Sequence, residues 1–224
     1  MLTIYKSIKG TKRGKTMNIE KAYNSWAKQY DTNKNKTRDL DIKSTIETLS
    51  RYNFNNVLEL GCGTGKNTQW LLKKATQIIG LDFSQEMLDI AKKKISQKQV
   101  KFKKADLTKE WEVENNFVDL ITSSLTLEHI NDLNHIFDQA SKKLVNNGLF
   151  FISELHPFKQ YTGSKARYET DTGVKELEVY THHVSDYIKN SKNNGFEILE
   201  VNEWFDEENT NEIPRLISFV FKKK

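Results

Sequence analysis

The sequence contains very little cysteine and proline. Among its 224 residues there is one cysteine, Cys62, and there are two prolines, Pro157 and Pro214. A single thiol excludes an intramolecular disulfide, and it excludes the clustered cysteines of a structural zinc site. We therefore expect a protein of the reducing cytoplasm, and we predict no metal site.

Long apolar runs are also absent. The longest of them, such as residues 148–153, are far shorter than the roughly 20 residues that cross a bilayer. The N-terminus is basic, but no apolar stretch follows it as in a signal peptide. The sequence therefore predicts a protein with no membrane partner.

The charge is unevenly distributed. The chain carries 35 Lys and Arg against 30 Asp and Glu, and five of the basic residues lie within residues 1–16, which contain no acid. The rest of the chain is balanced, with 30 charges of each sign. We predict that residues 1–16 form a basic, disordered leader, with Met17 as an alternative start. The neutral body argues against a nucleic-acid partner.

Short β-rich runs alternate with helical periodicity in the middle of the chain. Strands are predicted at residues 56–60, 77–81, 99–103, 117–122 and 149–153. Helices are predicted at residues 19–29, 39–52, 66–74, 85–96 and 132–145, the last one stopped by Asn147 and Gly148. Such alternation predicts βαβ units, a parallel sheet and helices on both of its faces.

The last third of the chain changes character. A helix is predicted at residues 184–194, and two β-like runs at residues 196–205 and 213–222 predict an antiparallel hairpin at the sheet edge. The expected fold class is α/β, a doubly wound, seven-stranded, mostly parallel sheet in one domain spanning residues 17–224. Between the fifth strand and this helix, residues 156–184 are polar and aromatic, and we expect them to form a lid.

A glycine-rich loop follows the first predicted strand. Gly61, Gly63 and Gly65 lie between that strand and a helix, where backbone can approach a ligand and free amides suit an anion. A phosphate-binding loop requires Gly-Lys-Ser/Thr, but Asn67 follows Lys66. A dinucleotide fingerprint requires Gly or Ala where Lys66 stands. Both signatures fail. A nicotinamide-dependent oxidoreductase, which would need the dinucleotide fingerprint, is therefore a disfavoured alternative.

Acidic residues follow the next two strands. Asp82 lies 21 residues after Gly61, where a carboxylate accepts hydrogen bonds from ribose hydroxyls. Phe83 and Met87 are candidates to pack on a base ring, with ordinary core packing as the alternative. Asp106 follows the third strand.

The pattern Glu59-x-Gly61-x-Gly63-x-Gly65, with Asp82 and Asp106 in register, resembles the class I S-adenosylmethionine-dependent methyltransferase family. The resemblance extends from about Asn18 to the C-terminus. It implies the Rossmann-like methyltransferase fold and S-adenosylmethionine as cofactor. It also implies roles for individual cofactor-binding residues: Gly61 and Gly63 in the loop that approaches the cofactor, Asp82 at the ribose, Phe83, Met87, Asp106 and Leu107 beside the adenine, the backbone of Ser123 beside the methionine portion, and Tyr30 closing over the cofactor.

Candidate catalytic residues follow the fourth and fifth strands. These are Glu128, His129 and His156. Methyl transfer from a sulfonium is in-line, so much of catalysis is positioning, and a base matters only when the nucleophile must lose a proton. A histidine with its usual pKa of about 6.5 suits that role. The alternative for both histidines is a structural hydrogen bond to a loop.

The predicted function is methyl transfer to an oxygen or nitrogen of a small molecule, by a monomer or homodimer. Aromatic and basic residues of the lid, among them Tyr161 and Arg167, suggest an acceptor with an anionic or aromatic part. The motif typical of amino-adenine methyltransferases is missing after the fourth strand, where Ser123-Ser-Leu-Thr126 stands. An RNA or protein methyltransferase and a non-catalytic S-adenosylmethionine-binding module stay as alternatives.

Overall fold

The computed structural model describes residues 19–32, 34–164, 167–170, 173–177, 179–206 and 212–224. The leader predicted at residues 1–16 lies outside this part of the chain. The helices are α1 (Ile19–Tyr30), α2 (Lys36–Leu49), α3 (Lys66–Leu71), α4 (Gln85–Lys94), the 3-10 helix η1 (Leu127–His129), α5 (Leu133–Lys143), α6 (Pro157–Tyr161) and α7 (Val184–Asn193). The strands are β1 (Asn56–Leu60), β2 (Gln77–Asp82), β3 (Val100–Lys104), β4 (Val118–Ser124), β5 (Leu144–Leu155), β6 (Arg167–Thr170), β7 (Gly173–Glu176), β8 (Phe196–Trp204) and β9 (Leu216–Lys223).

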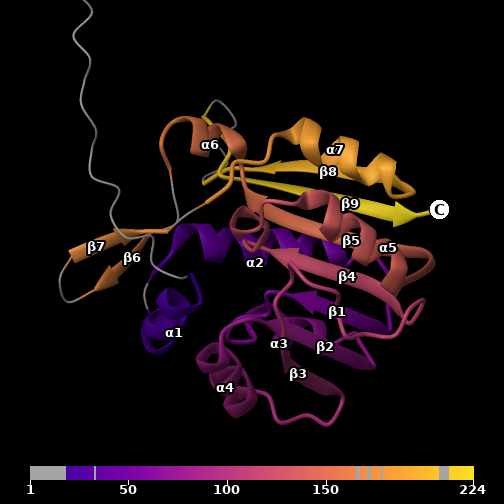
Figure 1. Cartoon of the computed structure of the whole chain (residues 1–224), viewed down its shortest axis with the longest axis horizontal. Helices are drawn as coiled ribbons and strands as arrows, with labels where there is room; N and C mark the ends of the chain where they lie inside the picture. Colours follow the sequence, from indigo (N-terminus) through magenta and orange to yellow (C-terminus); the bar gives the residue numbers. More distant parts are fainter. Residues whose placement is uncertain (1–18, 33, 165–166, 171–172, 178, 207–211) are drawn as a thin grey trace, which may run out of the picture.

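Seven strands form one sheet in the order β3-β2-β1-β4-β5-β9-β8. The first five pair in parallel, and β9 runs antiparallel to both of its neighbours. This confirms the doubly wound sheet and its C-terminal antiparallel hairpin. The carboxyl ends of the parallel strands meet at one edge, where α1, α6 and the β6–β7 hairpin also lie (Figure 1).

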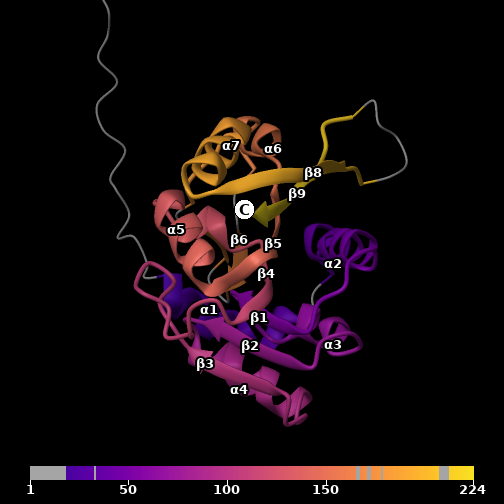
Figure 2. The ribbon, with the colours of Figure 1, turned by 90° about the vertical axis from the view of Figure 1, so that its right-hand side faces the viewer.

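Helices cover both faces of the sheet, with α2 and α3 on one side and α5 and α7 on the other (Figure 2). Alternate strand residues point to opposite faces, and β1 shows the consequence. Val57 packs in the core that contains Leu49 of α2 and Leu71 of α3. Leu58 and Leu60 pack in the other core, with Phe137 of α5 and Tyr187 of α7. Glu59, between them, points to the α3 face, where Thr68 Oγ1 donates to its carboxylate.

Two element boundaries predicted from the sequence are wrong. Helix α5 ends at Lys143, and Leu144 already belongs to β5 and pairs with Val118 of β4. The register between these strands then shifts, and Asn147 adopts a φ of 64° inside the strand. Between these pairs β5 advances five residues, from Leu144 to Leu149, while β4 advances two. The pair Asn147-Gly148 therefore lies in an irregular, bulged part of β5 and does not stop the helix. The other boundary is the start of α2 at Lys36, capped by Asn35, whose side chain accepts the Arg38 N–H.

The segment predicted to form a lid contains short regular elements. Helix α6 begins at Pro157, and β6 and β7 pair as an antiparallel hairpin. Leu177, just after β7, packs on α1 against Ala22. The side chain of Arg167 lies outside the described residues. No helix in the described ranges is long and apolar enough to cross a membrane.

Candidate active site

The glycine loop connects β1 to α3 and needs glycine at two places for different reasons. Gly61 has a φ of 66°, and a Cβ there would lie 2.1 Å from Oγ1 of Thr126. Gly63 has a φ of 52°, and a Cβ there would meet no atom within 4 Å. Gly61 therefore allows close packing against the loop after β4. Gly63 borders open space and leaves room for a ligand.

Asp82, at the end of β2, holds this loop in place. One carboxylate oxygen, Oδ2, accepts the Gly63 N–H at 2.8 Å, and Oδ1 accepts the Ser84 N–H at 2.8 Å. Burial raises the pKa of Asp82 to about 6, although the backbone hydrogen bonds oppose this shift. A carboxylate has about four acceptor sites, and the backbone N–H groups of Gly63, Ser84 and Phe83 occupy up to three of them. The carboxylate can thus hold the loop and accept a hydroxyl at the same time.

A cavity of about 610 Å³ opens beside the loop, which is large enough for a nucleoside-sized ligand. We call it the cofactor cavity. The structure brings nearly all of the predicted cofactor residues to its wall: Tyr30, Gly61, Gly63, Asp82, Phe83, Met87, Asp106 and Leu107. His129 also lines it.

Local contacts orient the residues at the adenine end of the cofactor cavity. Ser84 caps α4 by accepting the Met87 N–H, and Met87 is buried. The ring of Phe83 meets that of Tyr23 edge to face, with centroids 5.5 Å apart. Asp106 Oδ1 accepts from the N–H and the hydroxyl of Thr108 at 2.9 and 2.6 Å. This turn fixes the direction of the Asp106 carboxylate.

Ser123 lies one residue too early to line the cofactor cavity. It is fully buried in β4, paired with Leu60 and Ile152 in the middle of the sheet. The described wall after β4 is made instead by Ser124, Leu125 and Thr126. The strand ends two residues later than the sequence pattern predicts, at Ser124, and this explains the difference.

Comparison with known proteins agrees with this geometry. Residues 58–152, which carry the glycine loop, Asp82 and Asp106, match the model of a methyltransferase domain family. This part of the chain is therefore a methyltransferase domain, and its motifs resemble those of the class I S-adenosylmethionine-dependent methyltransferase family. S-adenosylmethionine is the cofactor of this family, and the open side of Gly63 and the carboxylate of Asp82 suit it.

Three relatives carry methyltransferase names. An uncharacterised methyltransferase of Emericella nidulans is 28% identical over 81% of this chain and 76% of its own length. A malonyl-[acyl-carrier protein] O-methyltransferase of Priestia megaterium is 33% identical over 60% of this chain and 50% of its own. Phosphoethanolamine N-methyltransferase 1 of Triticum aestivum is 33% identical over 65% of this chain and 30% of its own. The chain thus spans half or less of the latter two.

A solved structure shows the same fold. The S-adenosylmethionine-dependent methyltransferase structure from Listeria monocytogenes superposes with a TM-score of 0.71 at 23% identity, covering 84% of this chain and 99% of that one. At this identity the likeness concerns the fold alone. The kind of substrate that accepts the methyl group must therefore be inferred from the side chains that line the site of this chain.

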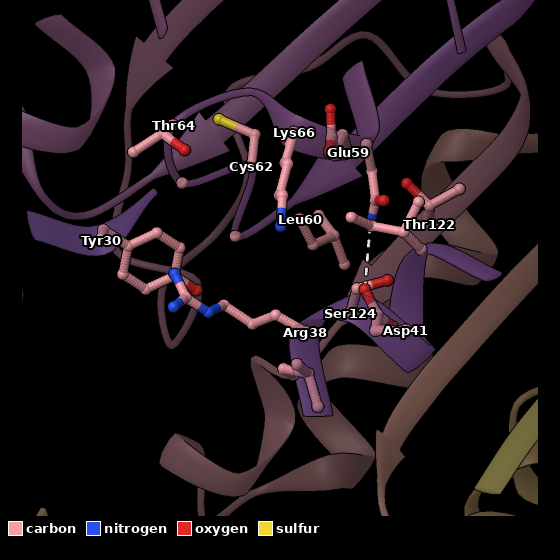
Figure 3. Close-up of a pocket in the computed structure, with 15 residues that line it drawn as sticks. Tyr30, Arg38, Asp41, Glu59, Leu60, Cys62, Thr64, Lys66, Thr122 and Ser124 are labelled. Carbon is pink, nitrogen blue, oxygen red and sulfur yellow. Dashed lines mark hydrogen bonds between the residues drawn. The ribbon is translucent and has the colours of Figure 1, made fainter. Parts of the chain in front are cut away.

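A small polar hollow continues from the cofactor cavity beneath the glycine loop (Figure 3). Arg38 and Tyr30 lie on one side of it, and Asp41 and Glu59 lie on the other (Figure 3). Burial raises the pKa of Asp41 to about 6 and that of Glu59 to about 8. The methionine end of S-adenosylmethionine carries a carboxylate and an ammonium group. The Arg38 guanidinium suits the carboxylate, and the side-chain oxygens of Asp41 and Glu59 suit the ammonium group. The sequence analysis missed Arg38, because it expected α2 to begin at residue 39.

A second cavity of about 310 Å³ adjoins the first. We call it the side cavity; it shares Tyr23, Tyr30 and Leu125 with the cofactor cavity. Its other lining residues come from α1, α2, η1, β5, the lid segment and the start of β9: Trp26, Asn35, Thr37, Arg38, Glu128, Leu155, Ser164 and Arg215. A cavity of this size, beside the cofactor, suits a small molecule.

Two of the three candidate catalytic residues meet at the junction of these cavities. His129 Nε2 lies 2.8 Å from the hydroxyl of Tyr23 and 4.0 Å from Oε1 of Glu128. Burial raises the pKa of the Tyr23 phenol well above 10. Tyr23 therefore keeps its proton, and its hydroxyl shares a hydrogen bond with Nε2 of His129. Burial also raises the pKa of Glu128 to about 7, with a hydrogen bond from Gln160 opposing the shift.

His156 occupies a different environment. Its Nδ1 accepts the Phe158 N–H and so caps α6, while Nε2 lies 3.1 Å from Oε1 of Glu203 on β8. Burial lowers the pKa of His156, against the effect of the Glu203 carboxylate. Neither the cofactor cavity nor the side cavity includes His156 among its described lining residues. These contacts correspond to the structural alternative considered for this residue.

Glu154 is a site residue to which sequence reasoning assigned no role. At the end of β5 its Oε1 accepts the N–H groups of Thr126 and Leu127, at 2.9 and 2.8 Å. The carboxyl is 2% exposed, and burial raises its pKa to about 8. Glu154 thus anchors the start of η1, the helix that carries Glu128 and His129.

Proposed function

We propose that this methyltransferase transfers a methyl group to an oxygen or nitrogen of a small molecule bound in the side cavity. The observation that supports this most is the wall shared by the two cavities at Tyr23, Tyr30 and Leu125. An acceptor in the side cavity would be separated from the cofactor by no more than the side chains of this wall. The relatives named above include both an O-methyltransferase and an N-methyltransferase.

The proposed roles follow from the contacts at this wall. His129, held by its hydrogen bond with Tyr23, positions an acceptor hydroxyl or amine in line with the methyl group. Glu128, which lines the side cavity, receives the proton that an acceptor loses. The cofactor supplies the electrophilic methyl carbon; the chain supplies alignment and one base. His156 has no part in this scheme.

The test is to incubate the protein with methyl-labelled S-adenosylmethionine and, separately, with small-molecule, RNA and protein fractions of a cell extract. We expect label in the small-molecule fraction. We expect Tyr23→Phe, which removes the bond to His129, to lower the turnover roughly 10- to 100-fold while S-adenosylmethionine affinity changes less than about threefold. Tyr52→Phe is the matched control, because the Tyr52 hydroxyl contacts Glu200, outside both cavities.

Two results would contradict the proposal in different ways. Label found only in RNA or protein would assign a macromolecular acceptor. Cofactor binding without transfer to any fraction would indicate a module that binds S-adenosylmethionine without catalysis.

A further inference from the structure

The side cavity has an acidic side chain at its buried end and polar or basic side chains at its opening. Glu128, 8% exposed, lies at the buried end, and Asn35, Thr37, Ser164 and Arg215 are half-exposed at the opening. A ligand in this cavity therefore meets an acid inside and polar or basic groups outside.

The buried end is rich in groups that favour a cation. The Glu154 carboxyl is close enough to Glu128 for the Glu128 charge to raise the pKa of Glu154, after the larger effect of burial. A carboxylate acceptor would be a third acid here, and like charges in a buried site repel. An ammonium group would instead compensate the charge of Glu128.

Aromatic side chains form the wall next to Glu128. The rings of Tyr23, Trp26 and Tyr30 lie in sequence along α1, with centroids 5.9 and 4.8 Å apart. The Arg38 guanidinium, which also lines the side cavity, already lies over two of these rings, 4.2 Å from the Tyr30 centroid and 5.6 Å from that of Trp26. Aromatic faces attract ammonium groups, most strongly where water is excluded.

The opening of the cavity has the opposite character. The guanidinium of Arg215 donates to the Asp206 carboxylate and to the Thr37 hydroxyl. The pKa of Asp206 is lowered by these Arg215 hydrogen bonds, and the charges of Lys159 and Lys36 lower it further. Arg215 lines the side cavity, and Lys36 and Lys159 lie close enough to its partner Asp206 for their charges to act on that carboxylate. This part of the opening is therefore more basic than the buried end.

We propose that the acceptor is a small amphoteric amine, whose nitrogen lies beside Glu128 and is methylated there, and whose carboxylate lies at the opening beside Arg215, with Lys36 and Lys159 near it. This inference rests on the proposed function and narrows it to one acceptor class. In the reaction the ammonium gives a proton to the Glu128 carboxylate. The nitrogen lone pair then forms the N–C bond while the C–S bond breaks, and that electron pair stays on sulfur, which yields neutral S-adenosylhomocysteine.

The test uses a homologous series of acceptors with the purified protein. The ω-amino acids from glycine to 6-aminohexanoate carry both groups; the matching ω-hydroxy acids lack the amine, and the matching alkylamines lack the anion. S-adenosylhomocysteine release gives the rate, and mass spectrometry identifies the methylated atom. We expect N-methylation of at least one ω-amino acid, with its alkylamine giving a several-fold higher KM and its hydroxy acid giving no product.

Two variants test the two ends separately. Glu128→Gln should lower kcat/KM for the ω-amino acid roughly 10- to 100-fold, whereas Glu114→Gln, a substitution on the exposed loop before β4, should not. Lys36→Gln/Lys159→Gln should raise the KM for the ω-amino acid several-fold and leave that for the alkylamine unchanged. S-adenosylmethionine affinity within about twofold of the wild type shows that each variant is folded.

The outcomes separate the two proposals. Methylation of the hydroxy acids, or of a carboxylate oxygen, in place of the amines would overturn the inference and leave the proposed function standing. The same holds if the small-molecule extract is methylated while every ω-amino acid is inert. If neither the series nor the extract accepts a methyl group, both proposals fail.

Discussion

Two residues of the glycine loop, Gly61 and Gly63, allow a matched test of the site geometry. Gly61 and Gly63 both have positive φ, of 66° and 52°, so Ala at either position carries the same backbone cost of about 1–2 kcal/mol. Only Gly61 has a neighbour in the way, since its added Cβ would lie 2.1 Å from Thr126 Oγ1. That hydroxyl also donates to the Ser124 carbonyl at 3.0 Å. Gly61→Ala must therefore displace Thr126.

The expected magnitudes follow from these contacts. Displacing a packed side chain costs about 1–3 kcal/mol. Gly61→Ala should thus lower the free energy of unfolding by about 1–3 kcal/mol more than Gly63→Ala does. Cofactor binding should respond differently: Gly63→Ala projects a methyl group into the open space of the cofactor cavity and should weaken S-adenosylmethionine binding at least about tenfold by steric exclusion.

Urea unfolding followed by circular dichroism measures the first quantity, and calorimetric titration with S-adenosylmethionine measures the second. The double variant Gly61→Ala/Thr126→Gly removes the side chain that the new methyl group would meet. It should recover most of the extra loss relative to Thr126→Gly alone. Equal unfolding free energies for Gly61→Ala and Gly63→Ala, or no recovery in the double variant, would refute the packing argument.

Three further predictions concern buried carboxylates. Asp82→Ala should weaken S-adenosylmethionine binding by about 1.5–3 kcal/mol, the usual range for a hydrogen bond to a charged group; unchanged affinity in calorimetry would remove Asp82 from the cofactor site. The raised pKa of Glu59, about 8, means that its contribution to stability is complete below pH ~4.5 and is lost as the pH rises through 8. Glu59→Gln should therefore lose less stability than the wild type between pH 5 and 8 in urea titrations, and parallel pH profiles would contradict this. Glu154→Ala leaves the amides of Thr126 and Leu127 without their acceptor and should lower the free energy of unfolding by about 2–4 kcal/mol; Glu154→Gln, which keeps an acceptor oxygen, should lose less, and equal losses would show that the hydrogen bonds are unimportant.

Much of the fold could be predicted because it depends on local patterns. Short apolar runs and helical periodicity located all seven strands of the main sheet to within a few residues. The boundary between α5 and β5 could not be placed in this way, because Asn147-Gly148 is typical both of a helix end and of a β-bulge. The pairing of Leu144 with Val118 decides between them, and that contact is not local.

The residues of the candidate site also fall into two groups, those that local sequence motifs locate and those that only long-range packing brings together. Gly61, Gly63 and Asp82 follow strand ends at recognisable spacings, so sequence motifs located them. Tyr23 is separated from His129 by 106 residues, and Glu154 lies 28 residues from the Thr126 amide that it binds. No spacing rule connects such pairs, since their proximity comes from the packing of α1 and β5 around η1.

The sequence by itself determined the layered α/β architecture, the glycine loop and the acids that face the cofactor, because strand periodicity and the order of strands and loops already bring these residues to one edge of a parallel sheet. Only the tertiary structure decided which polar groups are catalytic candidates and which are structural. His129 meets Tyr23 and the cofactor cavity, whereas His156 caps a helix and meets Glu203. Both histidines follow strand ends in the sequence; burial and the partners brought by distant segments give them different environments, and these arise only when the chain is packed.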